Sequence, residues 1–260
     1  MRIARYTAGD GAAFGVIEGD DEALAIRAID GHPFAPFQVV GDPQPLGTLR
    51  LLAPVLPSKV VAIGRNYAEH AAEMGNEVDL SEPPVVFLKP STSVIGPGDP
   101  VQYPVGISDQ VDYEGELAVI IARLCREVPV ERVSDVVLGF ACGNDVTARD
   151  LQRREQQWGR AKGFDTFCPI GPWVTTDLDP SDLAITTTVN GELKQARRTS
   201  QMMRGVDELV AHVSQAMTLL PGDVILTGTP AGVGPLAVGD EVSVSIESVG
   251  TLTNRVVARG

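Results

Sequence analysis

The sequence predicts an α+β fold that is mostly β, a roll or barrel of largely antiparallel strands. Short apolar segments separated by Gly, Asp and Pro turns run through most of the 260 residues. Only a few stretches repeat apolar residues at helical spacing. Strand and helix segments do not alternate regularly, which disfavours a doubly wound parallel sheet. No internal repeat or low-complexity segment is found in the sequence.

Residues 1–55 are predicted to form a small β-rich domain. The apolar segments "MRIARYT", "AAFGVIEG" and "EALAIRAI" are separated by Gly and Asp turns. The segment "DPQPLGT" at residues 42–48 has the composition of a linker, and the texture of the sequence changes after it. We therefore expect a second, larger domain over residues 56–260.

The larger domain is predicted to begin with a strand, a helix and a loop. "VVAIG" at residues 60–64 is typical of a buried strand, and "NYAEHAAEM" after it predicts a helix with Asn66 as its cap. "GNEVDLSEPP" is polar and ends in Pro, which favours a mobile surface loop. "VVFLKP" at 85–90 again resembles a strand, and the apolar runs at 117–121 and 136–142 predict two buried strands.

Two further helices are expected. "TARDLQRREQQWGRAK", residues 147–162, has helical periodicity that places Leu151, Arg154 and Trp158 roughly on one face. "DELVAHVSQAMTLL" predicts the second helix, which ends before "PGD". The segments that follow, "DVILTGTPAGVG" and "DEVSVSIESVGTLTNRVV", predict strands and turns.

Composition limits the possible functions. The chain is 43% hydrophobic and 21% charged, as expected of a globular protein, and its net charge of −13 argues against binding to nucleic acid or to an anionic membrane. The three cysteines have no CxxC spacing, and no run approaches 18 apolar residues. The N-terminus lacks the apolar region of a secretory signal. We expect a cytoplasmic protein that acts on a small molecule.

Two glutamates precede a buried strand in "VDYEGELAVII". Because strand residues two apart share a face, Glu114 and Glu116 are expected side by side, about 6–7 Å apart. Asp145 directly follows the apolar strand that ends near residue 142, in a position where catalytic residues are common. Three carboxylates suit a hard cation such as Mg²⁺ or Mn²⁺, whereas zinc would favour Cys or His. Two exposed acids at a sheet edge remain an alternative.

A histidine and a glutamate lie on one face of the first predicted helix. His70 and Glu73 are three residues apart and are therefore neighbours. A glutamate that accepts a hydrogen bond from one imidazole nitrogen leaves the other nitrogen basic, which suits deprotonation of water. The polar loop that follows suggests a lid that orders when substrate binds. A chance pair on a solvated helix is the alternative.

Several cations and one Gly-rich turn are further candidates. Lys89 and Lys162 each end an apolar or aromatic segment next to a turn, and Arg149 follows Asp145 by one helical turn. "LTGTPAGVG" offers Thr229 and backbone N–H groups that can hold a carboxylate, although such turns are common. The remaining cations of this region are expected at the solvated surface: Arg153, Arg154 and Arg160.

Six segments in order resemble the fumarylacetoacetate hydrolase family. They are "VVAIGRNYAEHAAEM", "PVVFLKPSTSVIGPGDPV", "VDYEGELAVII", "GFACGNDVTARDLQ", "RAKGFDTFCPIGPW" and "MTLLPGDVILTGTPAGVG". They extend from about residue 57 to 258. The resemblance implies a mixed β-sandwich roll, a homodimer, and a small N-terminal extension of the kind found in bacterial members. It also implies that Mg²⁺ or Mn²⁺ is held by Glu114, Glu116 and Asp145.

The resemblance also implies roles for other residues. His70 and Glu73 match the pair on the lid that activates water, and Lys162 matches a lysine that steadies the developing enolate or carboxylate. The remaining matches are to substrate-site positions: Arg149, Gln152, Thr229 and, as a supporting cation, Lys89. None of the metal-site or lid positions departs from the family pattern.

The expected activity is metal-dependent hydrolysis of a C–C bond in a 2-oxo dicarboxylic acid of the acylpyruvate or fumarylpyruvate type. Pyruvate would leave as an enolate whose charge the metal stabilises, in the catabolism of aromatic compounds. The same core can instead isomerise 2-hydroxyhepta-2,4-diene-1,7-dioate or decarboxylate oxaloacetate, which would make the protein an isomerase or a lyase. A metal-stabilised binding module without turnover is a further alternative, but it gives no reason for His70, Glu73 and Lys162.

Overall fold

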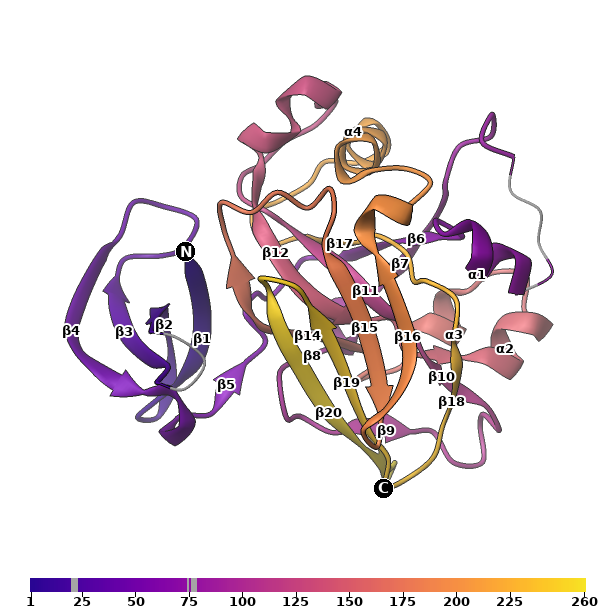
Figure 1. Cartoon of the computed structure of the whole chain (residues 1–260), viewed down its shortest axis with the longest axis horizontal. Coiled ribbons are helices and arrows are strands. Elements are labelled where there is room, and N and C mark those ends of the chain that lie inside the picture. The colour runs from indigo at the N-terminus through magenta and orange to yellow at the C-terminus, as the bar shows by residue number, and fades with distance from the viewer. Residues whose placement is uncertain (20–22, 74, 76–78) are drawn as a thin grey trace.

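The computed structural model describes residues 1–19, 23–73, 75 and 79–260. Its strands form three sheets, with a few short helices at their edges (Figure 1). The prediction of an α+β, mostly β fold is confirmed. Among the described residues, no helix combines the length and the apolar composition needed to cross a membrane.

The largest sheet runs through the whole molecule. Its strands are, in spatial order, β4 (Gln38–Pro45), β3 (Ala25–Asp30), β2 (Gly11–Glu18), β1 (Arg2–Ala8), β14 (Cys168–Thr175), β12 (Val137–Asn144), β11 (Gly115–Ile121), β17 (Val224–Leu226), β6 (Val60–Gly64) and β7 (Val85–Lys89). Two short strands pair beside this path: β5 (Leu51–Leu52) with β1, and β8 (Val94–Ile95) with β14. Most neighbours are antiparallel, but β17 is parallel to β6 and β8 to β14.

Two smaller sheets and the helices complete the fold. One sheet contains β16 (Glu192–Arg198), β15 (Ala184–Val189), β19 (Glu241–Ile246), β20 (Gly250–Ala258) and β9 (Val101–Tyr103). The other contains β13 (Thr147–Ala148), β10 (Val111–Tyr113) and β18 (Gly234–Leu236). The α-helices are α1 (Ala68–Glu73), α2 (Arg149–Arg154), α3 (Gly159–Lys162) and α4 (Val206–Ala216). Short 3-10 helices occur at Leu46–Thr48, Ser91–Ser93, Val130–Asp135 and Thr199–Gln201.

Strand β11 is buried on both faces. Leu117, Val119 and Ile121 belong to the core cluster that includes residues of β15, β19, β20 and α4. Ala118 and Ile120 belong to a second cluster, on the opposite face of the large sheet. Burial on both sides explains the continuous apolar run in the sequence. Glu116 lies at the start of this strand, and Glu114 directly precedes it.

The N-terminal strands form a lobe at one side of the molecule (Figure 1). This lobe continues the large sheet, because Arg2 and Ile3 of β1 pair with Thr175 and Val174 of β14. The prediction of a linker at residues 42–48 is wrong. Residues 42–45 are the second half of β4, and residues 46–48 form a 3-10 turn. Because β4 is the edge strand of its sheet, its prolines break no bond to a further strand.

The single helix predicted over residues 147–162 is interrupted. Helix α2 ends at Arg154, and Glu155 has extended backbone angles of φ −101° and ψ 135°. The break carries Trp158 away from the face that it would share with Leu151. Its indole instead packs edge-on against Phe87, with the ring centroids 5.3 Å apart. Tertiary packing of this aromatic pair therefore overrides the helical periodicity.

Asn66 does not act as the predicted cap of α1. The helix begins at Ala68, and the Asn66 side-chain oxygen accepts a hydrogen bond from the backbone N–H of Arg204 at 3.0 Å. Its amide nitrogen donates to the carbonyl oxygens of Thr227 and Arg204 at 2.8 and 3.0 Å. Asn66 therefore links its own segment by hydrogen bonds to the segments that contain Arg204 and Thr227. Within the loop predicted at residues 75–84, residues 76–78 lie outside the described residues.

Gly115 sets the distance between β11 and β15. A Cβ at this position would lie 2.1 Å from the buried Oγ1 of Thr187. We therefore expect Gly115→Ala to lower the free energy of unfolding by about 1–3 kcal/mol, the usual cost of overpacking. Urea unfolding measures this change. Gly47→Ala is the matched control, because a Cβ there meets no atom within 4 Å.

A second substitution at the same contact is expected to restore part of the lost stability. Thr187→Ala removes the hydroxyl that the new methyl group would strike, so the double variant should be more stable than Gly115→Ala alone. A double variant with no gain over Gly115→Ala would show that the clash is not the cause of the instability.

Candidate active site

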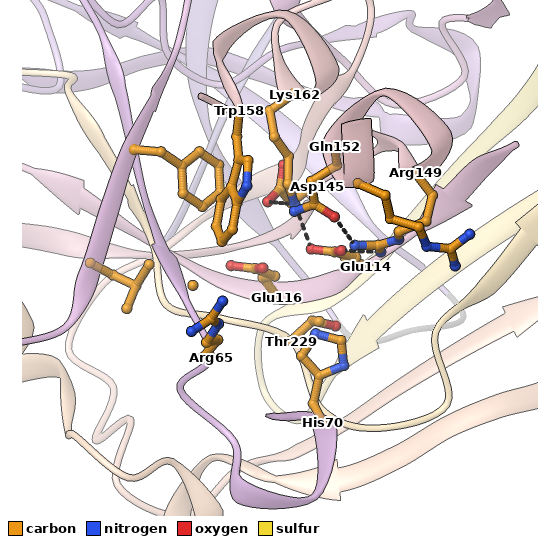
Figure 2. A pocket seen from close by; sticks show the side chains of 14 residues that line it. Arg65, His70, Glu114, Glu116, Asp145, Arg149, Gln152, Trp158, Lys162 and Thr229 are labelled. Carbon is orange, nitrogen blue, oxygen red and sulfur yellow. Dashed lines mark hydrogen bonds and ion pairs between the residues drawn. The ribbon is translucent and has the colours of Figure 1, made fainter. Parts of the chain in front are cut away.

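A cavity of about 270 Å³ lies where the head of β11, the end of β12 and helices α1–α3 meet. Eight of the ten predicted site residues line it: His70, Glu114, Glu116, Asp145, Arg149, Gln152, Lys162 and Thr229 (Figure 2). The other two, Glu73 and Lys89, each contact one of these eight. The structure thus brings the predicted residues together from segments distant in the sequence.

The three predicted metal ligands lie at adjoining strand ends. Glu114 occupies the gap between β10 and β11, where its backbone N–H donates to the side-chain oxygen of Asn144 at 3.0 Å. The N–H of Asp145 donates to the carbonyl oxygen of Glu114 at 2.8 Å. Glu116 follows on β11. Each of the three carboxylates offers an oxygen within 4.8 Å of the others, and all three are buried.

Buried cations surround two of these carboxylates. Lys162 Nζ donates to Glu114 Oε2 at 2.8 Å and to Asp145 Oδ2 at 2.6 Å. Lys89 Nζ donates to Asp145 Oδ1 at 2.5 Å from behind, rather than from the cavity. Arg149 donates to the other oxygen of Glu114. Glu114 and Asp145 are therefore held in place by fixed charges.

The acid that orients Arg149 was not among the predicted site residues. Asp112, on β10, accepts from Arg149 Nε at 2.8 Å, and its side chain is buried. On the other side of the guanidinium, Gln152 Oε1 accepts from Nη1 at 2.5 Å. The "VDYEGE" segment gives a weak signal for Asp112, since it shares a strand face with Glu114.

The two glutamates have opposite electrostatic environments. Burial disfavours the ionised form of Glu114, but the charges of Lys162 and Arg149 outweigh it and hold the pKa of this carboxyl well below its usual range. For Glu116, burial raises the pKa well above its usual range, and the charges of Asp145 and Glu114 raise it further. A backbone N–H from Gly228, 2.7 Å from Oε2, compensates only in part.

This donor set fits a divalent hard cation. All three ligand candidates present carboxylate oxygens, which Mg²⁺ and Mn²⁺ prefer. In the described part of the site, four buried acids face three buried cations: Asp112, Glu114, Glu116 and Asp145 against Lys89, Arg149 and Lys162. An added divalent charge would offset the excess of negative charge and stabilise the ionised form of Glu116.

The predicted pair on α1 also reaches the cavity. His70 Nδ1 lies 3.3 Å from Glu73 Oε2, and the backbone N–H of Gly232 donates to the same carboxylate at 3.2 Å. Figure 2 shows His70 beside Thr229, on the opposite side of the glutamates from Lys162. A histidine held in this way can exchange a proton with a molecule in the cavity.

A glutamine that sequence analysis missed fixes the Gly-rich turn. Gln195, on β16, is fully buried; its Oε1 accepts from the N–H of Gly115 at 3.0 Å, and its Nε2 donates to Thr229 Oγ1 at 2.9 Å. Thr229 in turn donates to the carbonyl oxygen of Gly115 at 2.9 Å. No local motif marks Gln195, because its partners are more than thirty positions away.

Other residues that line the cavity were also not predicted. Phe87 and Trp158 form an aromatic wall, and Lys162 Nζ lies 5.0 Å from the centre of the Phe87 ring. Arg153, expected at the solvated surface, is exposed but also lines the cavity, as does Arg65.

Comparison with known families gives two matches along the chain. Residues 59–257 match the family described as fumarylacetoacetate (FAA) hydrolase, C-terminal, and residues 1–54 match one described as Rv2993c-like, N-terminal. The chain is 52% identical to Protein Rv2993c of Mycobacterium tuberculosis over 266 residues, covering 100% of this chain and 99% of that protein. It is 42% identical to oxaloacetate tautomerase YisK of Bacillus subtilis over 223 residues, covering 81% and 74%.

Solved structures are similar over the same regions. A 5-carboxymethyl-2-hydroxymuconate delta-isomerase from Mycobacterium smegmatis superimposes with a TM-score of 0.92 at 51% identity, covering 100% of both chains. A fumarylpyruvate hydrolase from Pseudomonas aeruginosa, in complex with Mn²⁺ and pyruvate, gives a TM-score of 0.74 at 35% identity, covering 81% of this chain and 92% of that one.

Proposed function

The chain belongs to the fumarylacetoacetate hydrolase family, and from this premise we propose that it is a divalent-metal-dependent enzyme that hydrolyses a C–C bond in acylpyruvate-type 2-oxo acids and releases pyruvate. One observation carries the proposal: the His70–Glu73 pair faces a buried cluster of three carboxylates across one cavity. A carboxylate cluster alone would suit a binding site, whereas the added pair supplies a proton acceptor.

The 2-oxo acid end of the substrate is placed at the carboxylate cluster, where a bound cation would offset its negative charge. A divalent cation bound by Glu114, Glu116 and Asp145 would supply positive charge to the substrate's carboxylate and 2-oxo oxygens. Burial lowers the pKa of Lys162, but the charges of Asp145 and Glu114 outweigh it and raise that pKa above its usual value. Lys162 therefore stays protonated and contributes a fixed positive charge beside the developing enolate.

The His70–Glu73 pair acts at the other carbonyl group of the substrate. Glu73 accepts the Nδ1–H of His70, which leaves Nε2 free to take a proton from water. The hydroxide then attacks the carbonyl carbon, and the C–C bond breaks to give a carboxylic acid and the enolate of pyruvate. The enolate then takes up the proton that His70 removed from water, which gives pyruvate and restores neutral His70. The buried Arg149 and the partly buried Gln152 position the substrate along the cavity.

Isomerisation or tautomerisation is a second candidate, because similar proteins are named as an isomerase or a tautomerase as well as hydrolases. The chain is 51% identical to the structure named as an isomerase, 42% identical to the tautomerase and 35% identical to the fumarylpyruvate hydrolase. The same His70–Glu73 pair would then move a proton between a carbon and an oxygen or between two carbons of a dienol, without activating water.

A substrate panel tests these proposals. We expect the enzyme with Mg²⁺ or Mn²⁺ to consume an acylpyruvate with loss of its enol absorbance and release of pyruvate and a second acid. Oxaloacetate and 2-hydroxyhepta-2,4-diene-1,7-dioate are assayed in parallel. Pyruvate with CO₂ would indicate decarboxylation, and a spectral change without fragments would indicate isomerisation or tautomerisation. If no 2-oxo acid reacts with either metal, a binding module without turnover replaces the enzyme proposal.

A further inference from the structure

Arg65 lies at the cavity in a strained backbone conformation. It follows β6 with φ of 60°, in the left-handed region that large side chains disfavour. Its neighbours hold the turn: a Cβ on Gly64 would lie 3.0 Å from the indole of Trp158, and the Asn66 side chain bonds to two other segments. Residues in unfavourable backbone conformations cluster at functional sites, so the Arg65 side chain is a candidate for a functional contact.

The charge of Arg65 remains available to a ligand. The buried cations of the site already have carboxylate partners: Lys89 with Asp145, Lys162 with Glu114 and Asp145, and Arg149 with Asp112 and Glu114. Within the part of the chain that the structure describes, the Arg65 guanidinium makes no hydrogen bond or ion pair. It lines the cavity and is partly buried, so that a contact with an anion there would be only partly screened by water.

Arg65 lines the cavity at a distance from the buried Arg149. Figure 2 shows it on the side of Glu116 away from Arg149, next to the wall that contains Trp158. A 2-oxo acid end at the carboxylate cluster would leave the rest of the molecule free to extend along this wall. Resting on the proposed function, we propose that Arg65 binds a second, distal carboxylate and thereby selects dicarboxylic 2-oxo acids. The aromatic wall of Phe87 and Trp158, whose rings pack edge-on, offers an apolar surface to the spacer between the two carboxylates.

A binding experiment isolates this contact from catalysis. 2-Oxoglutarate and 2-oxopentanoate share the 2-oxo acid end and chain length, but only the former has a distal carboxylate. Calorimetric titration with Mn²⁺ present should show that Arg65→Gln weakens 2-oxoglutarate binding about tenfold more than 2-oxopentanoate binding, the scale of one charged hydrogen bond. Arg65→Lys should recover part of the preference. Equal weakening of both ligands would overturn the proposal.

Arg65→Gly separates binding from a structural role. Glycine adopts positive φ without strain, so this variant should unfold at an equal or higher temperature while losing the same preference for 2-oxoglutarate. A lower unfolding temperature with the preference retained would assign Arg65 a structural role. Arg153→Gln is the matched control, because Arg153 lines the same cavity but is exposed and donates to Gln110 at 3.1 Å. Loss of the preference in this control instead would overturn the assignment to Arg65.

The proposed function and the inference about Arg65 can be contradicted independently of each other. If no 2-oxo acid is converted but the preference for 2-oxoglutarate depends on Arg65, the proposed function fails and the binding inference stands. If acylpyruvates are hydrolysed but the Arg65 variants keep the wild-type preference, the inference fails and the proposed function stands.

Discussion

Replacing His70 with Ala is expected to reduce kcat by about a hundredfold or more, the usual scale for loss of a general base, without weakening the binding of the divalent metal. His70 lines the cavity, but it does not belong to the group of three metal-ligand candidates, whose carboxylate oxygens lie within 4.8 Å of one another. Its removal therefore takes away the proton acceptor and leaves the ligand set intact. Either proposed reaction, hydrolysis or proton transfer, depends on this acceptor.

The measurement compares turnover with metal affinity in the same samples. Pyruvate release gives kcat, and the rise in unfolding temperature on titration with Mn²⁺ gives the affinity. His32→Ala is the matched control, because His32 is exposed in the connection between β3 and β4. Glu73→Gln should have a smaller effect than His70→Ala, since it keeps an oxygen acceptor for the Nδ1–H of His70. Undiminished turnover in His70→Ala would remove this residue from the mechanism.

Part of this site was predictable because its spacing is local. Glu114 and Glu116 are two residues apart at the head of a strand, and His70 and Glu73 are three apart on a helix, so each pair shares a face whatever the tertiary structure. Asp145 was predictable from its position at the end of an apolar strand. The same local reasoning located most of the buried strands, including 60–64 and the run within β11.

Other features depend on contacts that local patterns do not encode. Gln195 reaches Gly115 and Thr229 from a different sheet, and no spacing rule connects them. Lys89 was expected as a supporting cation of the substrate site, but the sequence did not indicate that its partner would be Asp145, which it contacts from behind the cavity. The strand at residues 42–45 was missed because prolines normally indicate a break, and only its place at a sheet edge permits them.

Glu116→Gln is expected to make the metal-free protein more stable at neutral pH and to remove most of its stabilisation by Mn²⁺. Burial and the charges of Asp145 and Glu114 disfavour an ionised Glu116 in the folded state. A glutamine keeps the shape, and its side-chain oxygen can still accept the N–H of Gly228. The substitution therefore removes a destabilising charge and, with it, one of the three metal ligands.

The sign of the pH dependence follows from the raised pKa of Glu116. A carboxyl with a higher pKa in the folded state than in the unfolded state favours folding at low pH, where it is protonated in both states. That contribution is lost as the pH rises from the ordinary carboxyl pKa through the raised one. The stability advantage of Glu116→Gln without metal should therefore be small in acid, grow across this interval, and then level off.

Unfolding temperatures measured from acid to neutral pH, with and without Mn²⁺, test the stability gain of the metal-free Glu116→Gln variant and its loss of stabilisation by Mn²⁺. At a metal concentration of a hundred times Kd, the wild type should gain about 2.7 kcal/mol, and Glu116→Gln should gain much less. Glu192→Gln removes one negative charge from the exposed start of β16 and controls for net charge. Equal stabilisation of wild type and Glu116→Gln by Mn²⁺ would exclude Glu116 as a ligand. A metal-free variant less stable than wild type at neutral pH would show that the ionised Glu116 is compensated within the protein itself, which would remove the electrostatic argument for a bound cation.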